Sequence, residues 1–415
     1  QPFEGASNRT AVMVLEKGKP TTYPVPYTVW RKVGRKRFTY DSTLEEVTQA
    51  TKRLNFVAEP VDPKDLTSPW LTARPKALKA IRKVLGKSDY EAHEGVNTGG
   101  ANAVYWVNIV LKRPDGLVVV RNITEGARVE VDEVTEPIEP DLLYPLLRGR
   151  DVQRWKAEPS AWIIVPRLKQ SANTVIPLAD MQTKFPRTYG YLKRFEDVLR
   201  KRADAMVKSA LARGEPFYFY GAVGTYTFAP WKVVWREQAS TMTASVVGPK
   251  NSKPTVPDHK LMLVDCQSEG EAHFVCACLN SSIGQMVAVS YTVEIQMDPH
   301  ILEHIRIPRY EPKNPVHRRL SELSQEAHRL AAELAQYRDI DLSAQQLLEE
   351  IIRRLPAEQE DARRKLTDLL AKCERLQELE QEIDRQAAQL WGLSDEELRE
   401  VQESLAELEG EEATE

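Results

Sequence analysis

The sequence lacks any long hydrophobic run, because no apolar stretch reaches the roughly 18 residues that a membrane-spanning helix needs. Cysteine is scarce: four residues in 415 are too few for a disulfide-built scaffold and are typical of a reducing compartment. Hydrophobic residues make up 42% and charged residues 28% of the chain, which excludes global disorder. We therefore expect a folded, cytoplasmic protein of two or three units, without a membrane partner.

Common catalytic motifs are absent as well. Neither a Gly-x-x-x-x-Gly-Lys phosphate loop nor a Ser–His–Asp order occurs. Gly221 and Gly224 lie three residues apart in "FYGAVGTYTF", but a cofactor loop should follow a strand and open a helix. Here the glycines lead into a strand-like run, so we interpret them as a turn that enters a strand.

Metal sites have little support in the sequence. His273, Cys276 and Cys278 are close together in "HFVCACLN", but structural zinc needs paired ligand groups that are missing here, so we expect a buried apolar segment. A weak resemblance to the acid…acid-x-Lys pattern of metal-dependent nucleases involves Asp298, Glu311 and Lys313. Because Lys313 lies in a Pro-punctuated linker, we predict neither a metal site nor catalytic residues in this chain.

The two ends of the chain differ in charge. Residues 311–415 hold 14 Lys and Arg against 27 Asp and Glu, a net charge of −13. The preceding 310 residues hold 43 against 34, a net charge of +9, and 29 of the 31 aromatic residues. A basic body attracts a polyanion that the acidic tail repels, so nucleic acid is the partner that this pattern favours.

The tail has helical periodicity throughout. One run has apolar residues at helical spacing at Leu320, Leu323, Ala327, Leu330, Leu334 and Tyr337, and another at Leu366, Leu369, Cys373, Leu376, Ile383, Ala387 and Leu390. A shorter helix between them stops at Pro356, and Gly392 ends the long one. Ser394 and Glu397 form a capping box that begins a last helix. We expect an antiparallel helical hairpin that acts as a spacer or docking arm.

The body reads as a mixture of strands and helices. Runs rich in β-branched and aromatic residues predict strands at 10–17, 23–30, 103–111, 116–122, 127–134, 161–166, 226–235 and 260–266. Helices are expected at 74–85, 192–202 and 269–281. Because 23 of the 26 prolines lie here, we expect short strands joined by irregular connections.

Two polar loops of the body are candidates for nucleic-acid contact. "LLYPLLRGRDVQRW" places Arg148, Arg150 and Arg154 around a glycine turn, where guanidinium groups can present planar forks to phosphates or guanine edges.

The second loop, "GVNTGGANAVYW", offers Asn97, Thr98 and Asn102 with two glycines before a strand, and backbone N–H groups in such a loop can approach a phosphate closely. Ordinary turn chemistry remains an alternative explanation of both loops.

The ordered set of segments resembles the target-recognition region of adenine-specific DNA methyltransferases, of the class that includes fused type IIG restriction–modification enzymes and phage-defence methyltransferases. The resemblance runs from about residue 90 to about residue 405. It is carried, in order, by "GVNTGGAN", "LLYPLLRGRDVQRW", "WIIVPR", "FYGAVGTYTFAPWKVVW", "VPDHKLMLV", "CACLNSSIGQMVAVSYT", "IRIPRYEPKNPVHRRLSEL" and "EIDRQAAQLWGLSDEELREV".

The opening segment "QPFEGASNRTAVMVLEKG" resembles the last strands of the catalytic core in that class. The family's Asn/Asp-Pro-Pro-Tyr/Phe motif and S-adenosylmethionine loop are not found here, and no Pro-Pro pair occurs. Since the chain begins with Gln1 and has no leader, we expect it to be the C-terminal portion of a longer methyltransferase.

The resemblance implies a function for the complete enzyme. It implies that S-adenosylmethionine is the cofactor, that double-stranded DNA and a methyltransferase core on the same or a separate chain are the partners, and that the core flips out and methylates adenine. It does not identify the residues that read bases. We add Arg167, which ends "WIIVPR", and Lys232 in "FAPWKVVW" to the candidate DNA contacts as basic residues of these segments.

We therefore predict an α+β protein, with a strand-rich target-recognition domain followed by a long helical hairpin or bundle. The expected boundaries are 1–60 for the last strands of a core, 61–310 for the recognition domain and 311–415 for the helical spacer. A stand-alone specificity subunit that docks a separate methyltransferase is the main alternative, and a nuclease is a weaker one.

Overall fold

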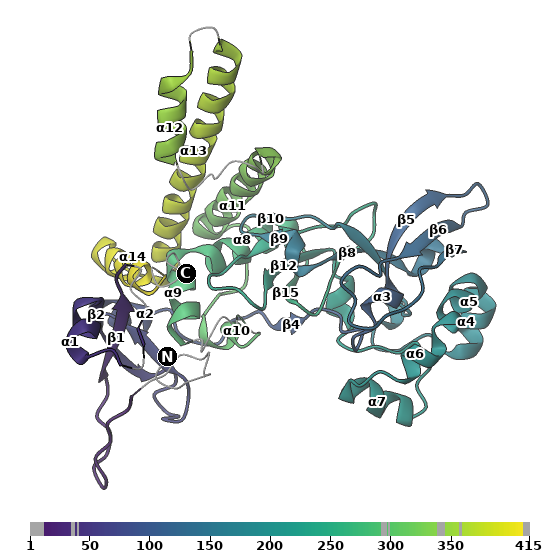
Figure 1. The fold of residues 1–415 in the computed structure, drawn as a ribbon, viewed down its shortest axis with the longest axis horizontal. Helices are drawn as coiled ribbons and strands as arrows, with labels where there is room; N and C mark the ends of the chain where they lie inside the picture. The colour runs from purple at the N-terminus through teal and green to yellow at the C-terminus, as the bar shows by residue number, and fades with distance from the viewer. Residues whose placement is uncertain are drawn as a thin grey trace.

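The computed structural model describes residues 12–34, 38–39, 41–291, 297, 299–337, 345–356 and 359–409. Figure 1 shows sheets spread along the long axis of the molecule, with C-terminal helices that rise from one part of it. The α+β fold class and the long helical C-terminal region are confirmed.

A small antiparallel sheet lies at one end of the molecule. Its strands are β1 (Val25–Lys32), β2 (Thr51–Pro60) and β3 (Trp70–Ala73), with α1 (Leu44–Gln49) between the first two and α2 (Pro75–Ile81) after the third. The expected strand at 10–17 is wrong for its described part, 12–17, which has no strand conformation. Its apolar side chains Val12, Met13, Val14 and Leu15 are all exposed, so no neighbouring strand or core holds an extended pairing there.

A six-stranded sheet forms the other end. Its strands, in order across the sheet, are β14 (Val256–Pro257), β8 (Leu143–Leu147), β11 (Ala161–Ile164), β5 (Trp106–Lys112), β6 (Val118–Asn122) and β7 (Thr135–Ile138). All neighbours are antiparallel except β14 and β8. The helices of this end are α3 (Asn102–Tyr105), α4 (Leu178–Lys184), α5 (Pro186–Arg194), α6 (Glu196–Arg200) and α7 (Ala205–Ala212).

A four-stranded antiparallel sheet connects the two ends. It contains β13 (Ser245–Val247), β12 (Trp231–Arg236), β15 (Leu261–Cys266) and β4 (Ala92–Glu94). A short hairpin of β9 (Val152–Gln153) and β10 (Lys156–Ala157) lies beside it, and α8 (Glu269–Asn280), α9 (Ser282–Tyr291) and α10 (Ile301–His304) follow. Short 3-10 turns lie at 140–142, 149–151, 169–171, 225–228 and 335–337.

The expected strand at 127–134 is wrong, because most of this segment is irregular and the next strand, β7, begins at Thr135. The Asn122 side chain accepts a hydrogen bond from the Val134 N–H at 2.7 Å and donates one to the Asp132 carbonyl at 3.0 Å. A side-chain amide thus takes the place of ladder hydrogen bonds at the point where the alternating pattern predicts a strand.

The tail follows its predicted helices closely. They are α11 (Pro315–Leu334), α12 (Gln345–Arg354), α13 (Glu360–Trp391) and α14 (Asp395–Glu409). Gly392 ends α13 with φ +69°, and the Ser394 and Glu397 side chains cap each other's backbone N–H groups at the start of α14. The helix α12 packs on α13, and both project away from the sheets (Figure 1).

One hydrophobic core joins elements from the second and third predicted segments. It contains Leu71 of β3, Ile81 of α2, Trp235 of β12, Phe274 of α8 and Val401 of α14, all nearly fully buried. The first sheet and the last helix are therefore parts of one packed unit, and the predicted boundaries at 60 and 310 remain predictions.

Ion pairs reinforce the contact between α14 and α2. Arg74 pairs with Glu400, Glu403 and Glu407, Lys76 pairs with Glu396 and Glu400, and Lys83 pairs with Glu397 at 2.7 Å. Part of the negative charge of the tail is thus neutralised by cations of the body.

Within the described part of the chain, no single helix has the length and apolar character to cross a membrane; α8 and α9 meet that test only together, as a pair bent by 60°.

Two histidines, the buried His273 and the partly buried His328, join α11 to the central sheet and α8. His328 accepts a hydrogen bond from the Val246 N–H at 2.8 Å through Nε2, and its Nδ1 contacts the Ser324 carbonyl at 2.7 Å. His273 contacts the Ser324 hydroxyl at 3.0 Å. Burial lowers the pKa of His328 to about 4 and that of His273 to about 3, so both are neutral in the folded protein at pH 7.

Acid should therefore destabilise this junction. Below their ordinary pKa near 6.5, the histidines take up protons in the unfolded chain but stay neutral in the folded protein. Their contribution to the free energy of unfolding is therefore complete above pH 6.5 and is lost as the pH falls. We expect each histidine to contribute a loss of about 2 kcal/mol between pH 7 and pH 5. Chemical unfolding at both pH values should show a smaller loss in His328→Gln than in the wild type, whereas exposed His300→Gln should leave it unchanged. An equal loss in His328→Gln would contradict this account.

Candidate nucleic-acid interface

The predicted polar loop lies between β4 and α3, where Asn97, Thr98 and Asn102 are close together. The Thr98 hydroxyl donates a hydrogen bond to the Asn102 side chain, and the Asn97 side chain accepts one from the Gly99 N–H at 2.9 Å. The Asn97 backbone exchanges two hydrogen bonds with Gly221, at 3.0 and 3.1 Å. Thr98 is buried, while Asn97 and Asn102 are partly exposed. The loop is a rigid turn that offers its two asparagines at the surface.

Glycine is required at Gly99, which has φ +66°, because a Cβ atom there would lie 2.9 Å from the Val207 side chain of α7. The loop and α7 are thus in close contact.

Arg202 fixes the loop to the helices, a role that the sequence does not reveal. Its guanidinium is buried and donates to the carbonyls of Thr98 at 2.9 Å, Leu199 at 2.7 Å and Phe217 at 2.9 Å. The sequence shows only three consecutive cations at 200–202. Nothing in their order distinguishes the buried one from the two exposed ones.

Arg148 and Arg150 differ in their surroundings although they share one loop. Arg148 is 9% exposed, donates to the Ser160 hydroxyl at 2.5 Å and lies 3.4 Å from the Asp151 carboxylate, which also accepts from the Ser160 hydroxyl at 2.6 Å. Arg150 is exposed and has no hydrogen bond or ion pair with the described residues. The geometry makes Arg148 a structural clamp and leaves Arg150 available for a partner.

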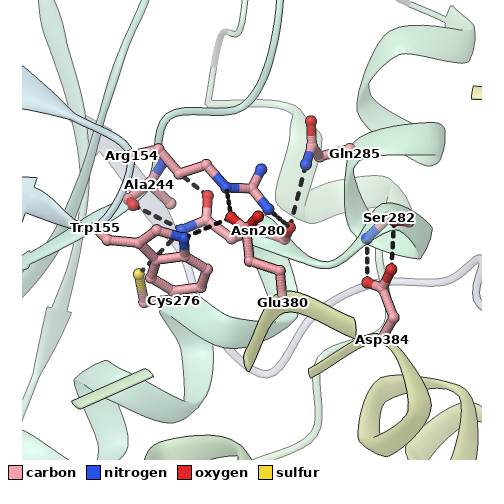
Figure 2. A network of polar contacts seen from close by, with 9 residues as sticks. All are labelled: Arg154, Trp155, Ala244, Cys276, Asn280, Ser282, Gln285, Glu380 and Asp384. Atoms are coloured by element: carbon pink, nitrogen blue, oxygen red, sulfur yellow. Dashed lines mark hydrogen bonds and ion pairs between the residues drawn. The ribbon is translucent and has the colours of Figure 1, made fainter. Parts of the chain in front are cut away.

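Arg154 and Trp155 form the turn of the β9–β10 hairpin, and this turn is inserted between the helices (Figure 2). Arg154 donates to Glu380 of α13 at 2.6 Å and to the Asn280 carbonyl at 2.8 Å, and the Trp155 indole N–H donates to Glu380 at 2.8 Å. Trp155 is 2% exposed and has φ +62°, a strained conformation for a bulky residue that persists only where its surroundings hold it.

Neighbouring contacts extend this junction along α13. Asn280 bridges the Ala244 backbone with hydrogen bonds at 2.7 and 3.1 Å, and Asp384 accepts from the Ser282 N–H at 2.7 Å (Figure 2). Burial raises the pKa of Asp384, and the hydrogen bonds from Ser282 oppose that rise. Arg154 is therefore engaged within the protein and links the hairpin to α13.

Arg167 and Lys232 lie in the interior. Arg167 is 3% exposed, donates to the Tyr220 carbonyl at 2.8 Å and lies over the Phe219 ring. Lys232 is 1% exposed and donates to the Ala229 carbonyl at 2.6 Å, and burial lowers its pKa to about 7. In this conformation neither cation is accessible to a phosphate, so DNA contact by either would need a rearrangement of the fold.

The glycine segment does not fit S-adenosylmethionine. The Gly221 N–H is bonded to Asn97, and the Gly224 N–H donates to the Thr227 hydroxyl at 3.1 Å. A 3-10 turn and then β12 follow, where a cofactor loop would open a helix. Both N–H groups are used internally, so this loop offers no cradle for the cofactor.

The residues that resemble metal ligands in the sequence do not form a metal site among the described residues. Asp298 of the nuclease-like set lies outside the described residues. Cys276 and Cys278 are buried thiols on α8. Within the described ranges, no group of three or more His, Cys, Asp and Glu side chains is placed to hold a metal ion.

No family model matches the sequence. The chain is 27% identical over 148 residues to the type II methyltransferase M.NspV from Nostoc sp., and the match covers 36% of this chain and 29% of that protein. The resemblance to a methyltransferase indicated by the sequence segments is confirmed over this stretch.

Two solved structures align with larger parts of the chain. They are the type IIL restriction–modification enzyme MmeI in complex with DNA, with a TM-score of 0.37, 8% identity and coverage of 86% of this chain and 40% of that chain, and the type IIG restriction endonuclease BpuSI, with a TM-score of 0.33, 11% identity and coverage of 75% and 33%. These TM-scores are too low to assign a shared fold. The chain spans less than half of the length of each of these three proteins.

Replacing the two loop arginines should separate their roles. Arg148→Ala removes the cation beside the Asp151 carboxylate and the donor to the Ser160 hydroxyl, so we expect a loss of about 1–3 kcal/mol in unfolding free energy. Arg150→Ala should change stability by less than about 0.5 kcal/mol and weaken binding to duplex DNA. Thermal unfolding and titration of a labelled duplex measure the two effects, with Arg150→Lys as the charge-conserving control. Equal stability losses in both alanine variants would show that Arg148 is no clamp.

The junction at Glu380 should contribute to stability. Glu380→Ala removes the acceptor of both Arg154 and Trp155, and we expect a cost of about 1–2 kcal/mol because the pair is partly exposed. Glu378→Ala on the same helix, where the carboxylate is 65% exposed, should cost close to nothing. Urea unfolding compares the stabilities, and amide exchange of residues 152–157 should accelerate in Glu380→Ala alone. Equal stability and equal amide exchange in the two variants would show that the Glu380 contacts do not stabilise the protein.

Proposed function

We propose that this chain is the DNA-recognition portion of an adenine-specific DNA methyltransferase of a restriction–modification or phage-defence system. The observation that carries the proposal is the match to a type II methyltransferase over 148 residues. Adenine as the target base and the link to phage defence are supported by the ordered sequence segments quoted above.

The charge distribution supports DNA as the partner. The first 310 residues have a net charge of +9, although α2 uses some of its cations to hold α14. The polar loop 97–102 and Arg150 present hydrogen-bond donors at the surface of the body. In this proposal they contact the duplex, and the methyl transfer takes place in a catalytic core that binds S-adenosylmethionine.

The residues of this chain therefore serve to bind and orient the DNA. Asn97, Asn102 and Arg150 can donate to phosphates or base edges. Arg148 and Arg202 hold the loops that carry these groups. No group of this chain is assigned a part in the transfer itself.

The full chain should bind duplex DNA with a steep dependence on salt. Each neutralised phosphate releases counterions, so log K should fall with log [salt] by about 0.9 per contact. Fluorescence anisotropy with a 30-base-pair duplex of mixed sequence at 50–300 mM KCl measures the slope. Absence of binding at 50 mM KCl would refute the proposed function.

The chain alone should not transfer methyl groups. The N–H groups of Gly221 and Gly224 are bonded within the protein and a strand rather than a helix follows them, so calorimetry should detect no S-adenosylmethionine binding in the micromolar range. Incorporation of labelled methyl groups into DNA by the purified 415 residues would reveal an active site where we place none.

A further inference from the structure

The helices α4–α7 form a layer beside the six-stranded sheet, with α5 packed against β7, and this layer is strongly basic. Residues 184–213 contain nine Lys and Arg against three Asp and Glu. One of the nine, Arg202, is buried. The other eight are exposed: Lys184, Arg187, Lys193, Arg194, Arg200, Lys201, Lys208 and Arg213.

Half of these exposed cations are already neutralised within the protein. Lys184 pairs with Asp180, Lys193 and Arg200 pair with Glu196, and Arg194 pairs with Glu136. The remaining four, Arg187, Lys201, Lys208 and Arg213, have no carboxylate partner among the described residues. Lys201 follows α6, Lys208 lies on α7 and Arg213 follows α7, so unpaired positive charge concentrates at the α6–α7 side of the layer.

Hydrogen bonds anchor α5 of this layer beside the sheet. The Glu139 carboxylate accepts from the first N–H groups of α5, at Arg187 and Thr188. The hydroxyl of buried Tyr191 donates to the Val104 carbonyl at 2.7 Å, and that of Tyr105 donates to the Tyr218 carbonyl at 3.0 Å. A surface fixed in this way loses little conformational freedom when it binds a partner.

The α6–α7 side also borders the polar loop. Arg202 bonds the loop to the end of α6, and Gly99 lies against Val207 of α7. On the other flank, the exposed Arg128 side chain passes close to Gly100, since a Cβ atom built there would lie 4.0 Å from Arg128 Cδ. The loop thus lies between Arg128 on one side and α7, which carries Lys208, on the other.

We infer that Arg128, Lys201 and Lys208 form a phosphate-binding surface for duplex DNA, which places the loop 97–102 against the nucleic acid. This inference rests on the proposed function and assigns the contact to residues outside the glycine–arginine loop. The cations in and beside α2 are unsuited to the role because Arg74, Lys76 and Lys83 pair with the acidic face of α14.

A matched pair of triple variants of the full chain tests this surface. Arg128→Ala/Lys201→Ala/Lys208→Ala removes three exposed charges here, and Lys17→Ala/Lys52→Ala/Lys64→Ala removes three exposed charges at the other end of the molecule. We expect the first variant to bind a 30-base-pair duplex about tenfold to a hundredfold more weakly at 0.1 M KCl, with the salt slope reduced by about three. The second should bind within about twofold of the wild type. Thermal unfolding confirms that both are folded, and Arg128→Lys/Lys201→Arg/Lys208→Arg should bind like the wild type.

The outcomes separate this inference from the proposed function. If the wild type does not bind duplex DNA, the proposed function itself fails. If the wild type binds and the first variant keeps its affinity and salt slope, the assignment of this surface is wrong while the proposed function stands. The same conclusion follows if the second variant loses as much affinity as the first. A wild type that binds an RNA duplex of the same sequence as tightly as DNA would overturn the assignment of DNA as the ligand.

Discussion

Three arginines direct their guanidinium groups to acceptors inside the protein, and these contacts hold the loops and helices of the molecule together. Arg202 finds three carbonyls and thereby joins the polar loop to α6 and to the segment before Tyr218. Arg154 finds Glu380 and the Asn280 carbonyl and thereby joins the β9–β10 hairpin to α13. Arg148 finds Ser160 and Asp151. The arginines that hold the loops in place are therefore different from those that remain for a partner.

The charge asymmetry of the chain has two distinct consequences. At the α2–α14 contact, opposite charges meet within the protein and fasten its first helices to its last. At the α4–α7 layer, four exposed cations have no carboxylate partner among the described residues, and this positive charge is available to an external polyanion. The overall values of +9 and −13 combine these two effects, and only the positions of the side chains separate them.

The sequence predicts the regular parts of the fold well and the orientation of single cations poorly. Helix α13 and its end at Gly392 follow from apolar spacing and from one residue that tolerates positive φ, both of which are local signals. The strand expected at 127–134 fails because the Asn122 side chain, from another strand, takes the hydrogen bonds. Similarly, the sequence around Arg148 and Arg150 does not distinguish the two arginines. Arg148 is buried because it contacts Ser160 and Asp151 in the folded chain. Lys232 lies in an apolar strand whose neighbours only the tertiary structure supplies.

The contact between the first and last helices also constrains when the protein can fold. Arg74 and Glu403 are separated by 329 residues, and the Trp155 turn meets Glu380 across 225. During synthesis, which proceeds from the N-terminus, α2 and the strained hairpin turn are complete long before α13 and α14 leave the ribosome. Their apolar surfaces stay without their native cover for that interval, and contacts of such long range slow the final closure of the core. Exposed apolar surface of this kind makes the folding chain prone to aggregation until α14 can pack on α2.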